Sequence, residues 1–175
     1  MLNQDFKELY PGREDGLVTK WETSKAFIID LIKKETSQSD SYTLKQLDDY
    51  AKTPEGLQDA IILNLLPQLL IRRARGKNST DVISIAEARK IFILHVTIPG
   101  DINRAVQNHA SYLKQLNLPL QPTLVFVGPT ISNISASYVQ IESTRYLMRT
   151  PVKALDTNLF CIVFNNWGQF RISMY

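Results

Sequence analysis

The stretch that decides the fold is Gln121-Pro122-Thr123-Leu124-Val125-Phe126-Val127-Gly128-Pro129, an apolar run bounded by turn residues. Two shorter runs follow it, Ser137-Tyr138-Val139-Gln140-Ile141 and Arg145-Tyr146-Leu147-Met148. Runs of β-branched and aromatic residues separated by Gly, Pro, Ser and Asn are typical of strands joined by turns. We therefore predict a strand over 122–127 and a hairpin over about 136–148.

The segment after the hairpin predicts a helix that covers the strands. Thr150 is a capping residue, Pro151 takes the first helical position, and apolar residues recur at helical spacing to about Asn165. The tail from Trp167 to Tyr175 alternates only weakly, so we expect a last strand or a frayed end there.

A strand and two helices are predicted before the deciding stretch. Ser84 and Glu87 form a capping-box pattern that begins a short helix. The run 91–96 (IFILHV) has the composition of a buried strand. A turn at 99–100 then precedes a helix over 101–116. The order β-α-β-β-β-α indicates an α+β fold in which helices cover a small mixed sheet.

The N-terminal part of the chain predicts helices. Between 17 and 35, apolar residues recur mostly three, four or seven positions apart, as on one face of an amphipathic helix. We expect Trp21 and Phe27 to be buried anchors of that helix. The polar run 36–41 contains no apolar residue and predicts a loop.

Two further helices are predicted in this half. Thr43 followed by Gln46 is a capping-box pattern for a short helix that ends before Pro54. A strongly apolar helix over 57–75 comes next. Pro67 in its middle should kink or split it, because proline lacks an N–H donor and clashes with the preceding turn.

The segment 76–81 (GKNSTD) is polar and rich in turn formers, which indicates a linker. It separates a helical half, residues 1–76, from an α/β half, residues 82–175. A chain of 175 residues lies in the usual range for one domain and buries enough surface for a core. We therefore expect the two halves to pack as one domain.

The residue types that carry catalysis are sparse. Only two histidines, the commonest general base, are present. We expect His95, inside an apolar run, to be a core or sheet-edge histidine with a satisfied ring nitrogen, and His109 to face solvent. Gly128-Pro129-Thr130 lacks the further glycines and the lysine of a phosphate-binding loop and indicates a turn. We predict no catalytic residue and expect that the chain is not an enzyme.

Metal and cofactor sites are not predicted either. The single cysteine and the two histidines lack zinc-ligand spacing. Cys161 stands in an apolar run and is expected to be a buried, unreactive thiol. No run approaches the ~20 apolar residues that span a bilayer, and no secretory signal opens the chain. We expect no membrane contact and an intracellular location, cytoplasmic or nuclear.

The positive charge is concentrated at one place. The net charge is +3, and four basic residues lie close together: Arg72, Arg73, Arg75 and Lys77. At the C-terminus of a helix they offset the negative end of the helix dipole, a structural role that needs no partner. They are also candidate contacts for a protein partner or for the phosphates of nucleic acid, although the interleaved aromatic residues of a single-strand binder are absent.

Several short motifs resemble a family of uncharacterised animal proteins, namely the region outside the sterile alpha motif in proteins similar to sterile-alpha-motif domain-containing protein 3. The matching motifs are Leu9-Tyr10-Pro11-Gly12-Arg13-Glu14-Asp15, a Trp-bearing helix, a Leu-rich segment at 63–70, Phe92-Ile93-Leu94-His95-Val96, Leu120-Gln121-Pro122, Val127-Gly128-Pro129, Tyr138-Val139 and Ala154-Leu155-Asp156. Their order and spacing match across most of residues 5–165. The tail from Trp167 to Tyr175 departs from the family, and no sterile alpha motif precedes the match.

The resemblance implies a fold unit that recurs beside interaction modules, without an established activity or functional residues to carry over. Two functions follow as hypotheses. The first is a non-enzymatic protein-interaction or scaffold domain of unidentified partner. It would use the basic cluster or the exposed edge of the hairpin 136–148, and a weak homodimer through that edge fits this hypothesis too. The second is a nucleic-acid-binding domain, of mobile-element or viral origin, that uses Arg72, Arg73, Arg75 and Lys77.

Overall fold

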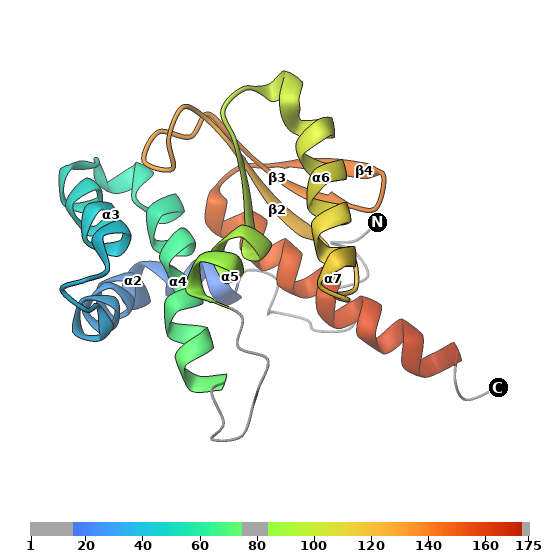
Figure 1. The fold of residues 1–175 in the computed structure, drawn as a ribbon, viewed down its shortest axis with the longest axis horizontal. Coiled ribbons are helices and arrows are strands. Elements are labelled where there is room, and N and C mark those ends of the chain that lie inside the picture. The colour runs from blue at the N-terminus through green and yellow to red at the C-terminus, as the bar shows by residue number, and fades with distance from the viewer. Residues whose placement is uncertain (1–15, 75–83, 173–175) are drawn as a thin grey trace.

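The structure is a computed structural model that describes residues 16–74 and 84–172, with the side chains of 16–70 and 84–162. Figure 1 shows helices packed around a small sheet. The elements in chain order are α2 (Gly16–Glu35), α3 (Ser41–Lys52), η1 (Glu55–Leu57), α4 (Asp59–Ala74), α5 (Ile85–Phe92), β1 (Ile93–Val96), η2 (Pro99–Asp101), α6 (Ile102–Gln115), β2 (Thr123–Val127), β3 (Ala136–Ile141), β4 (Thr144–Met148) and α7 (Pro151–Ile172). The predicted α+β fold and the order β-α-β-β-β-α are confirmed.

The sheet is mixed and has the strand order β1-β2-β3-β4. β1 runs parallel to β2, which requires the crossover through α6, and the other two pairs are antiparallel. In Figure 1, α6 lies on one face of the sheet and α7 on the other. The strand order leaves β1 and β4 at the two edges of the sheet.

One core joins the helical segment to the sheet. The sheet face that α7 covers contributes Ile93, Leu124, Phe126 and Val139, and these residues belong to the same buried cluster as residues of α2 and α4. A second, smaller cluster lies under α6 and includes Val96, Ile102, Val125 and Val127. Every residue of β2 is buried because helices cover both of its faces, which explains its continuous apolar sequence.

Four details differ from the prediction. Phe27 is 64% exposed, because the buried stripe of α2 runs through Trp21, Lys25, Ile29 and Ile32 instead. Lys25 can lie in this stripe because its ammonium group pairs with Glu22 and Glu55. Its charged residue type therefore did not indicate a buried position.

The cap of α3 is Asp40 and not Thr43. The Asp40 carboxylate accepts a hydrogen bond from the Thr43 backbone N–H at 3.0 Å, as an N-cap residue does. Thr43 is itself fully buried, inside the first turn of the helix. The capping-box pattern of Thr43 and Gln46 was therefore a wrong prediction, shifted by three residues from the true cap.

Two helices, α4 and α7, differ from the prediction. Pro67 lies inside α4 without dividing it into two elements, and it is buried where α2, α3, α5 and α7 pack around that helix. We attribute the continuity of α4 at Pro67 to this packing, which offsets the loss of the hydrogen bond that proline cannot make. α7 continues to Ile172, so the residues from Trp167 onward are helical up to that point and form neither a strand nor a frayed end there. The predicted linker at 76–81 lies outside the described residues.

Candidate functional site

The basic cluster lies where no side chain is described. Arg72 and Arg73 belong to the last turn of α4, the helix end at which they were predicted, but their side chains are outside the described set. Arg75 and Lys77 lie outside the described residues altogether. The contact of these four residues with a polyanion or a protein therefore stays a prediction.

The hairpin places β4 at the edge of the sheet. Ile141 pairs with Thr144, so two residues, Glu142 and Ser143, form the turn. Glu142 has a positive φ of 49°, as this tight turn requires. Within residues 16–74 and 84–172, no strand pairs with the outer side of β4. In a hairpin of this length the pair that flanks the turn is hydrogen-bonded, and alternate residues point their backbone groups outward. Arg145 and Leu147 therefore direct their N–H and C=O groups away from β3.

Apolar side chains accompany this free edge. Leu147 is 68% exposed and Tyr146 is 40% exposed. Leu147 lies opposite Tyr138, on the sheet face where β1, β2 and α6 form the smaller buried cluster, and it is not part of that cluster. A large aliphatic side chain exposed beside unpaired backbone groups is the usual composition of a strand edge that accepts another strand.

A cleft of about 390 Å³ adjoins the end of β4. Leu147, Met148 and Arg149 line one side, and Leu57 and Asp59 line the other. Leu57 is exposed and adds apolar surface next to the edge. The Asp59 carboxylate accepts a hydrogen bond from the Trp21 indole Nε1–H at 2.7 Å. Burial raises the pKa of this carboxyl group above its ordinary value.

The edge carries positive charge. The Arg145 guanidinium donates to the side-chain oxygens of Gln140, at 3.1 Å, and Asn103, at 2.8 Å. Neither acceptor is a carboxylate. Arg149, directly after β4, is exposed and has no ion pair with a described residue. Two arginines without acidic partners among the described residues therefore flank Leu147.

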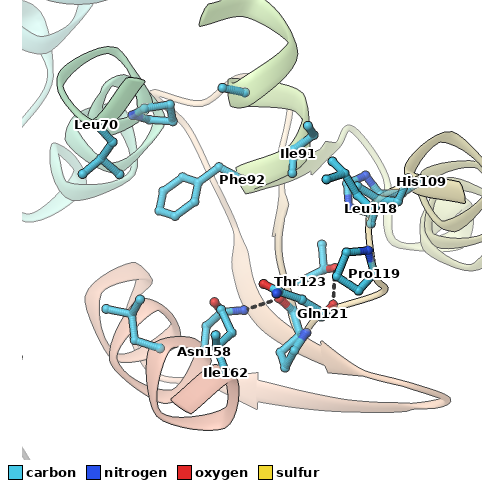
Figure 2. Close-up of a pocket in the computed structure, with 15 residues that line it drawn as sticks. Leu70, Ile91, Phe92, His109, Leu118, Pro119, Gln121, Thr123, Asn158 and Ile162 are labelled. Carbon is cyan, nitrogen blue, oxygen red and sulfur yellow. Dashed lines mark hydrogen bonds between the residues drawn. The ribbon is translucent and has the colours of Figure 1, made fainter. Parts of the chain in front are cut away.

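A second cavity, of about 350 Å³, lies among four helices. Figure 2 shows Leu70 from α4, Phe92 from α5, His109 from α6 and Ile162 from α7 around it. Residues 118–123, which lead into β2, close the remaining side. The Asn158 amide donates to the Pro122 carbonyl oxygen at 2.7 Å and so joins α7 to this segment.

His109 is a residue that sequence reasoning misplaced. It was predicted to face solvent, but only 6% of it is exposed. Ile102, His109 and Leu113 are the buried residues of α6, at the seven- and four-residue spacing of one helix face. That spacing was visible in the sequence, but the predicted buried face of the helix ran through Val106 and Ala110, which placed His109 one position off it. Burial lowers the pKa of His109 below its ordinary value of 6.5, so the ring is neutral at pH 7.

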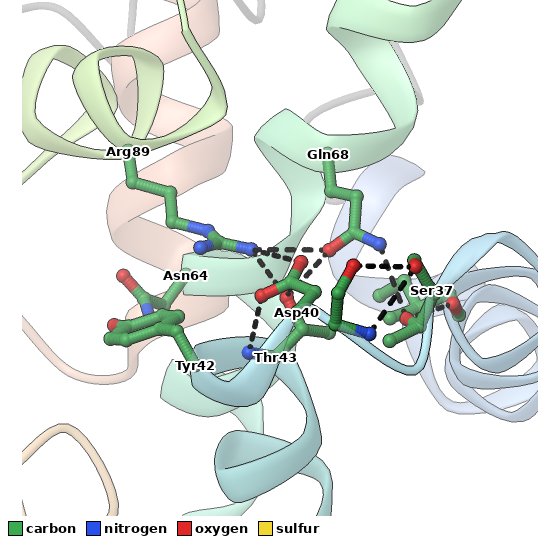
Figure 3. Close-up of polar contacts among 10 residues, drawn as sticks. Ser37, Asp40, Tyr42, Thr43, Asn64, Gln68 and Arg89 are labelled. Atoms are coloured by element: carbon green, nitrogen blue, oxygen red, sulfur yellow. Dashed lines mark hydrogen bonds and ion pairs between the residues drawn. The ribbon is translucent and has the colours of Figure 1, made fainter.

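A third cleft, of about 950 Å³, has an arginine at its edge whose side chain is largely buried. Figure 3 shows Arg89 of α5 directed toward Thr43 of α3 and Gln68 of α4. One terminal nitrogen, Nη2, donates to Thr43 Oγ1 at 2.7 Å and to Gln68 Oε1 at 3.1 Å, and it lies 4.0 Å from the Asp40 carboxylate. The guanidinium also stacks on Tyr42, 4.5 Å from the ring centroid.

This network is a clamp between helices. Gln68 is fully buried, and burial lowers the pKa of Arg89 below its ordinary value. The Arg89 Nε is buried without a hydrogen-bond partner among the described residues. Because every described contact of the guanidinium is made within the fold, we assign Arg89 to holding α3, α4 and α5 together.

Two further residues with reactive side chains, His95 and Cys161, lie where the sequence predicted them. His95 lies on the edge strand β1, where one ring nitrogen, Nε2, is hydrogen-bonded to the Gly128 carbonyl oxygen at 2.9 Å, so the prediction of a satisfied sheet-edge histidine is confirmed. Cys161 is buried as predicted, and burial raises the pKa of its thiol. Among residues 16–74 and 84–172, no three His, Cys, Asp or Glu side chains gather as metal ligands would.

Neither the described helices nor comparisons with known proteins point to a function for this chain. None of the described helices is both long enough and apolar enough to cross a membrane. Comparisons with models of protein families, with curated proteins and with solved structures find no match to this chain, and the resemblance noted from its motifs therefore stays a prediction.

Proposed function

We propose that this chain is a non-enzymatic protein-interaction domain that binds an extended, acidic segment of a partner protein along the outer edge of β4. The observation that carries the proposal is the free edge itself. Leu147, the most exposed large apolar side chain among the described residues, lies on that edge beside outward-pointing backbone groups. A peptide that adds a strand there gains main-chain hydrogen bonds from the edge and specificity from side-chain contacts.

The charge of the edge selects an acidic occupant. Arg145 and Arg149 stand two residues before and two residues after Leu147, and neither has a carboxylate partner among the described residues. Like charges placed opposite each other across a strand pair are destabilising, whereas opposite charges stabilise it. The preferred segment therefore has an apolar residue near Leu147 and acidic residues close to the arginines.

The same charges disfavour a second copy of this chain as the occupant. An antiparallel pair of two β4 strands centred on Leu147 would place Arg145 of each chain opposite Arg149 of the other. Such a dimer would contain two like-charge cross-strand pairs. The homodimer predicted from the hairpin is therefore the weaker alternative at this edge, and a foreign acidic segment is favoured.

The test is a selection from a random-peptide display library on the wild-type protein, followed by affinity measurements on the enriched peptides. We expect enriched sequences that combine acidic residues with one large apolar residue. Two variants separate the contributions. Leu147→Ala removes the side chain alone, whereas Leu147→Pro also removes the outward N–H, which an edge strand tolerates. We expect Leu147→Pro to weaken binding about tenfold more than Leu147→Ala, since a hydrogen bond and close backbone contact are both lost.

Two controls make the result decisive. Arg149→Glu should weaken binding of the selected acidic peptides, whereas Lys45→Glu, an exposed position on α3, should not. Peptides that bind both Leu147 variants as tightly as the wild type would exclude the β4 edge. Binding to random nucleic acid that falls steeply with salt, and that is lost on charge reversal at Arg72 and Arg73, would favour the nucleic-acid hypothesis instead.

A further inference from the structure

We propose that the cavity among α4, α5, α6 and α7 is a binding site for a small uncharged molecule, with an aromatic body and one hydroxyl group that hydrogen-bonds to His109. The site is separate from the β4 edge. The class of ligand follows from three properties of the cavity: its size, the absence of charge on its described walls, and the unpaired imidazole within it.

The size and lining suit a single small ring. A cavity of about 350 Å³ is at the lower end of the range that holds small ligands. Its walls are largely aliphatic and aromatic, with Phe92, Leu113 and Ile162 among them. Among the described lining residues none carries a formal charge at pH 7. An ionic ligand would lose its hydration there without gaining a counter-charge, so the occupant is neutral.

The specific feature of this cavity is His109. It is more than nine-tenths buried, and no hydrogen bond joins its ring to any described residue. The described side-chain atoms that are both inaccessible and unpaired do not include the His109 ring nitrogens, so these nitrogens reach open space. His109 lines this cavity and also the larger cleft on the other side of α5. Its ring therefore borders open space, where a ligand can supply the missing hydrogen bond.

The chemistry of the His109 imidazole indicates which polar group the ligand carries. A neutral imidazole has one nitrogen that donates and one that accepts. A hydroxyl group can serve either nitrogen, because it both donates and accepts. A phenolic hydroxyl is attached directly to an aromatic body, which suits the apolar wall that includes Phe92 and Leu118 (Figure 2). The other buried polar side chains in the lining, Thr123 and Asn158, already donate hydrogen bonds to the carbonyl oxygens of Gln121 and Pro122.

The test compares 4-ethylphenol with ethylbenzene, which has the same body without the hydroxyl group. Binding to the wild-type protein is followed by NMR, using the ring signals of His109 and the methyl signals of Leu113 and Ile162. We expect both probes to shift the methyl signals and the phenol alone to shift the His109 ring signals. The phenol should bind about three- to tenfold more tightly, the effect of one hydrogen bond to a buried acceptor.

Three variants check the assignment. His109→Phe should abolish the preference for the phenol, and His109→Gln, which retains a donor and an acceptor, should keep part of it. Ala88→Phe places a ring in the cavity from α5 and should weaken both probes. No saturable shifts up to the solubility limit, equal affinities for the two probes, or binding unchanged by Ala88→Phe would each overturn the proposal. The wild-type comparison and Ala88→Phe remain decisive even if His109→Phe does not fold.

Discussion

At the scale of single residues, His109 couples the apolar cavity to pH. Burial is the cause that lowers the pKa of the folded-state imidazole below 6.5, so the unfolded chain binds the proton more readily than the folded chain. The contribution of neutral His109 is fully present above pH 6.5. It is lost as the pH falls from there toward the lower pKa of the folded state.

This gives the first prediction. The free energy of unfolding of the wild type, measured with urea at pH 7.5 and pH 5, should fall more on acidification than that of His109→Phe, which cannot be protonated. At pH 7.5 the variant should be as stable as the wild type or more stable, because replacing an unpaired buried polar group by an apolar one is neutral or favourable. Equal losses in both proteins would show that His109 is not the group that titrates.

Gly128 is the residue at which the backbone leaves no room for a side chain. A Cβ atom there would lie 2.3 Å from the Asn133 carbonyl oxygen and 2.6 Å from the Ile134 Cα. Both are backbone atoms of the segment that folds back over the end of β2, so neither can move aside cheaply. The Gly128 N–H also donates to the Val96 carbonyl oxygen at 3.0 Å and ties this point to the end of β1.

We therefore predict that Gly128→Ala is strongly destabilising, by more than about 1 kcal/mol, the effect of an alanine where the native backbone excludes it. Gly100→Ala is the matched control, because a Cβ at Gly100 meets nothing within 4 Å. Thermal or urea unfolding of the two variants measures the difference. A Gly128→Ala protein as stable as Gly100→Ala would mean that the 130–135 segment does not pack against the end of β2.

At the scale of elements, the C-terminal part of the chain was predictable and the N-terminal part less so, for a physical reason. Strand composition and turn residues act locally, so β2, the hairpin and the capping box of Ser84 and Glu87 could all be inferred. The details missed in α2 and α3 depend on tertiary contacts. Lys25 pairs with Glu55, thirty residues further along the chain, and Thr43 accepts a hydrogen bond from Arg89 and donates one to Gln68.

The clamp at Arg89 is the element-scale feature that can be tested. Arg89→Ala leaves Thr43 and Gln68 without their charged donor and removes the cation that lies 4.0 Å from the Asp40 carboxylate. Removing one member of a buried charged network costs about 3 kcal/mol or more. We predict a loss of this size in the free energy of unfolding, measured with urea.

Lys90→Ala, at an exposed position of the same helix, provides the control and should change stability by less than about 0.5 kcal/mol. If the free energy of unfolding falls by similar amounts in the two variants, the loss comes from a change in α5 itself and not from the contacts of Arg89 with α3 and α4. A selective loss in Arg89→Ala would confirm that the three helices are held through this guanidinium.

At the scale of the whole molecule, the two candidate sites differ in how far the sequence could reveal them. The free edge was predicted, because a hairpin that ends a sheet exposes one strand. The cavity was not, because its walls come from four helices and the segment before β2, and no local pattern encodes their meeting. His109 illustrates the limit: the helical spacing allowed burial, but only the packing of α6 against its neighbours decides it.

The last prediction concerns self-association through the β4 edge. In a two-fold antiparallel pair centred on Leu147, each Arg145 would oppose Arg149 of the other copy, and the pair would repel. The wild type should therefore sediment as a monomer at low ionic strength, and any dimer through this edge should increase as salt rises from about 0.01 M to about 1 M and the Debye length shrinks from about 30 Å to about 3 Å.

The variant Arg149→Glu reverses this expectation. It replaces both like-charge pairs by Arg–Glu pairs, so it should dimerise more strongly than the wild type, and rising salt should dissociate it. Adding Leu147→Pro to Arg149→Glu should return the protein to a monomer, because the outward N–H that bridges the strands is lost. If Arg149→Glu stays monomeric at all salt concentrations in sedimentation experiments, the edge does not pair with a second strand of this chain. If the double variant still dimerises, the contact lies elsewhere on the molecule.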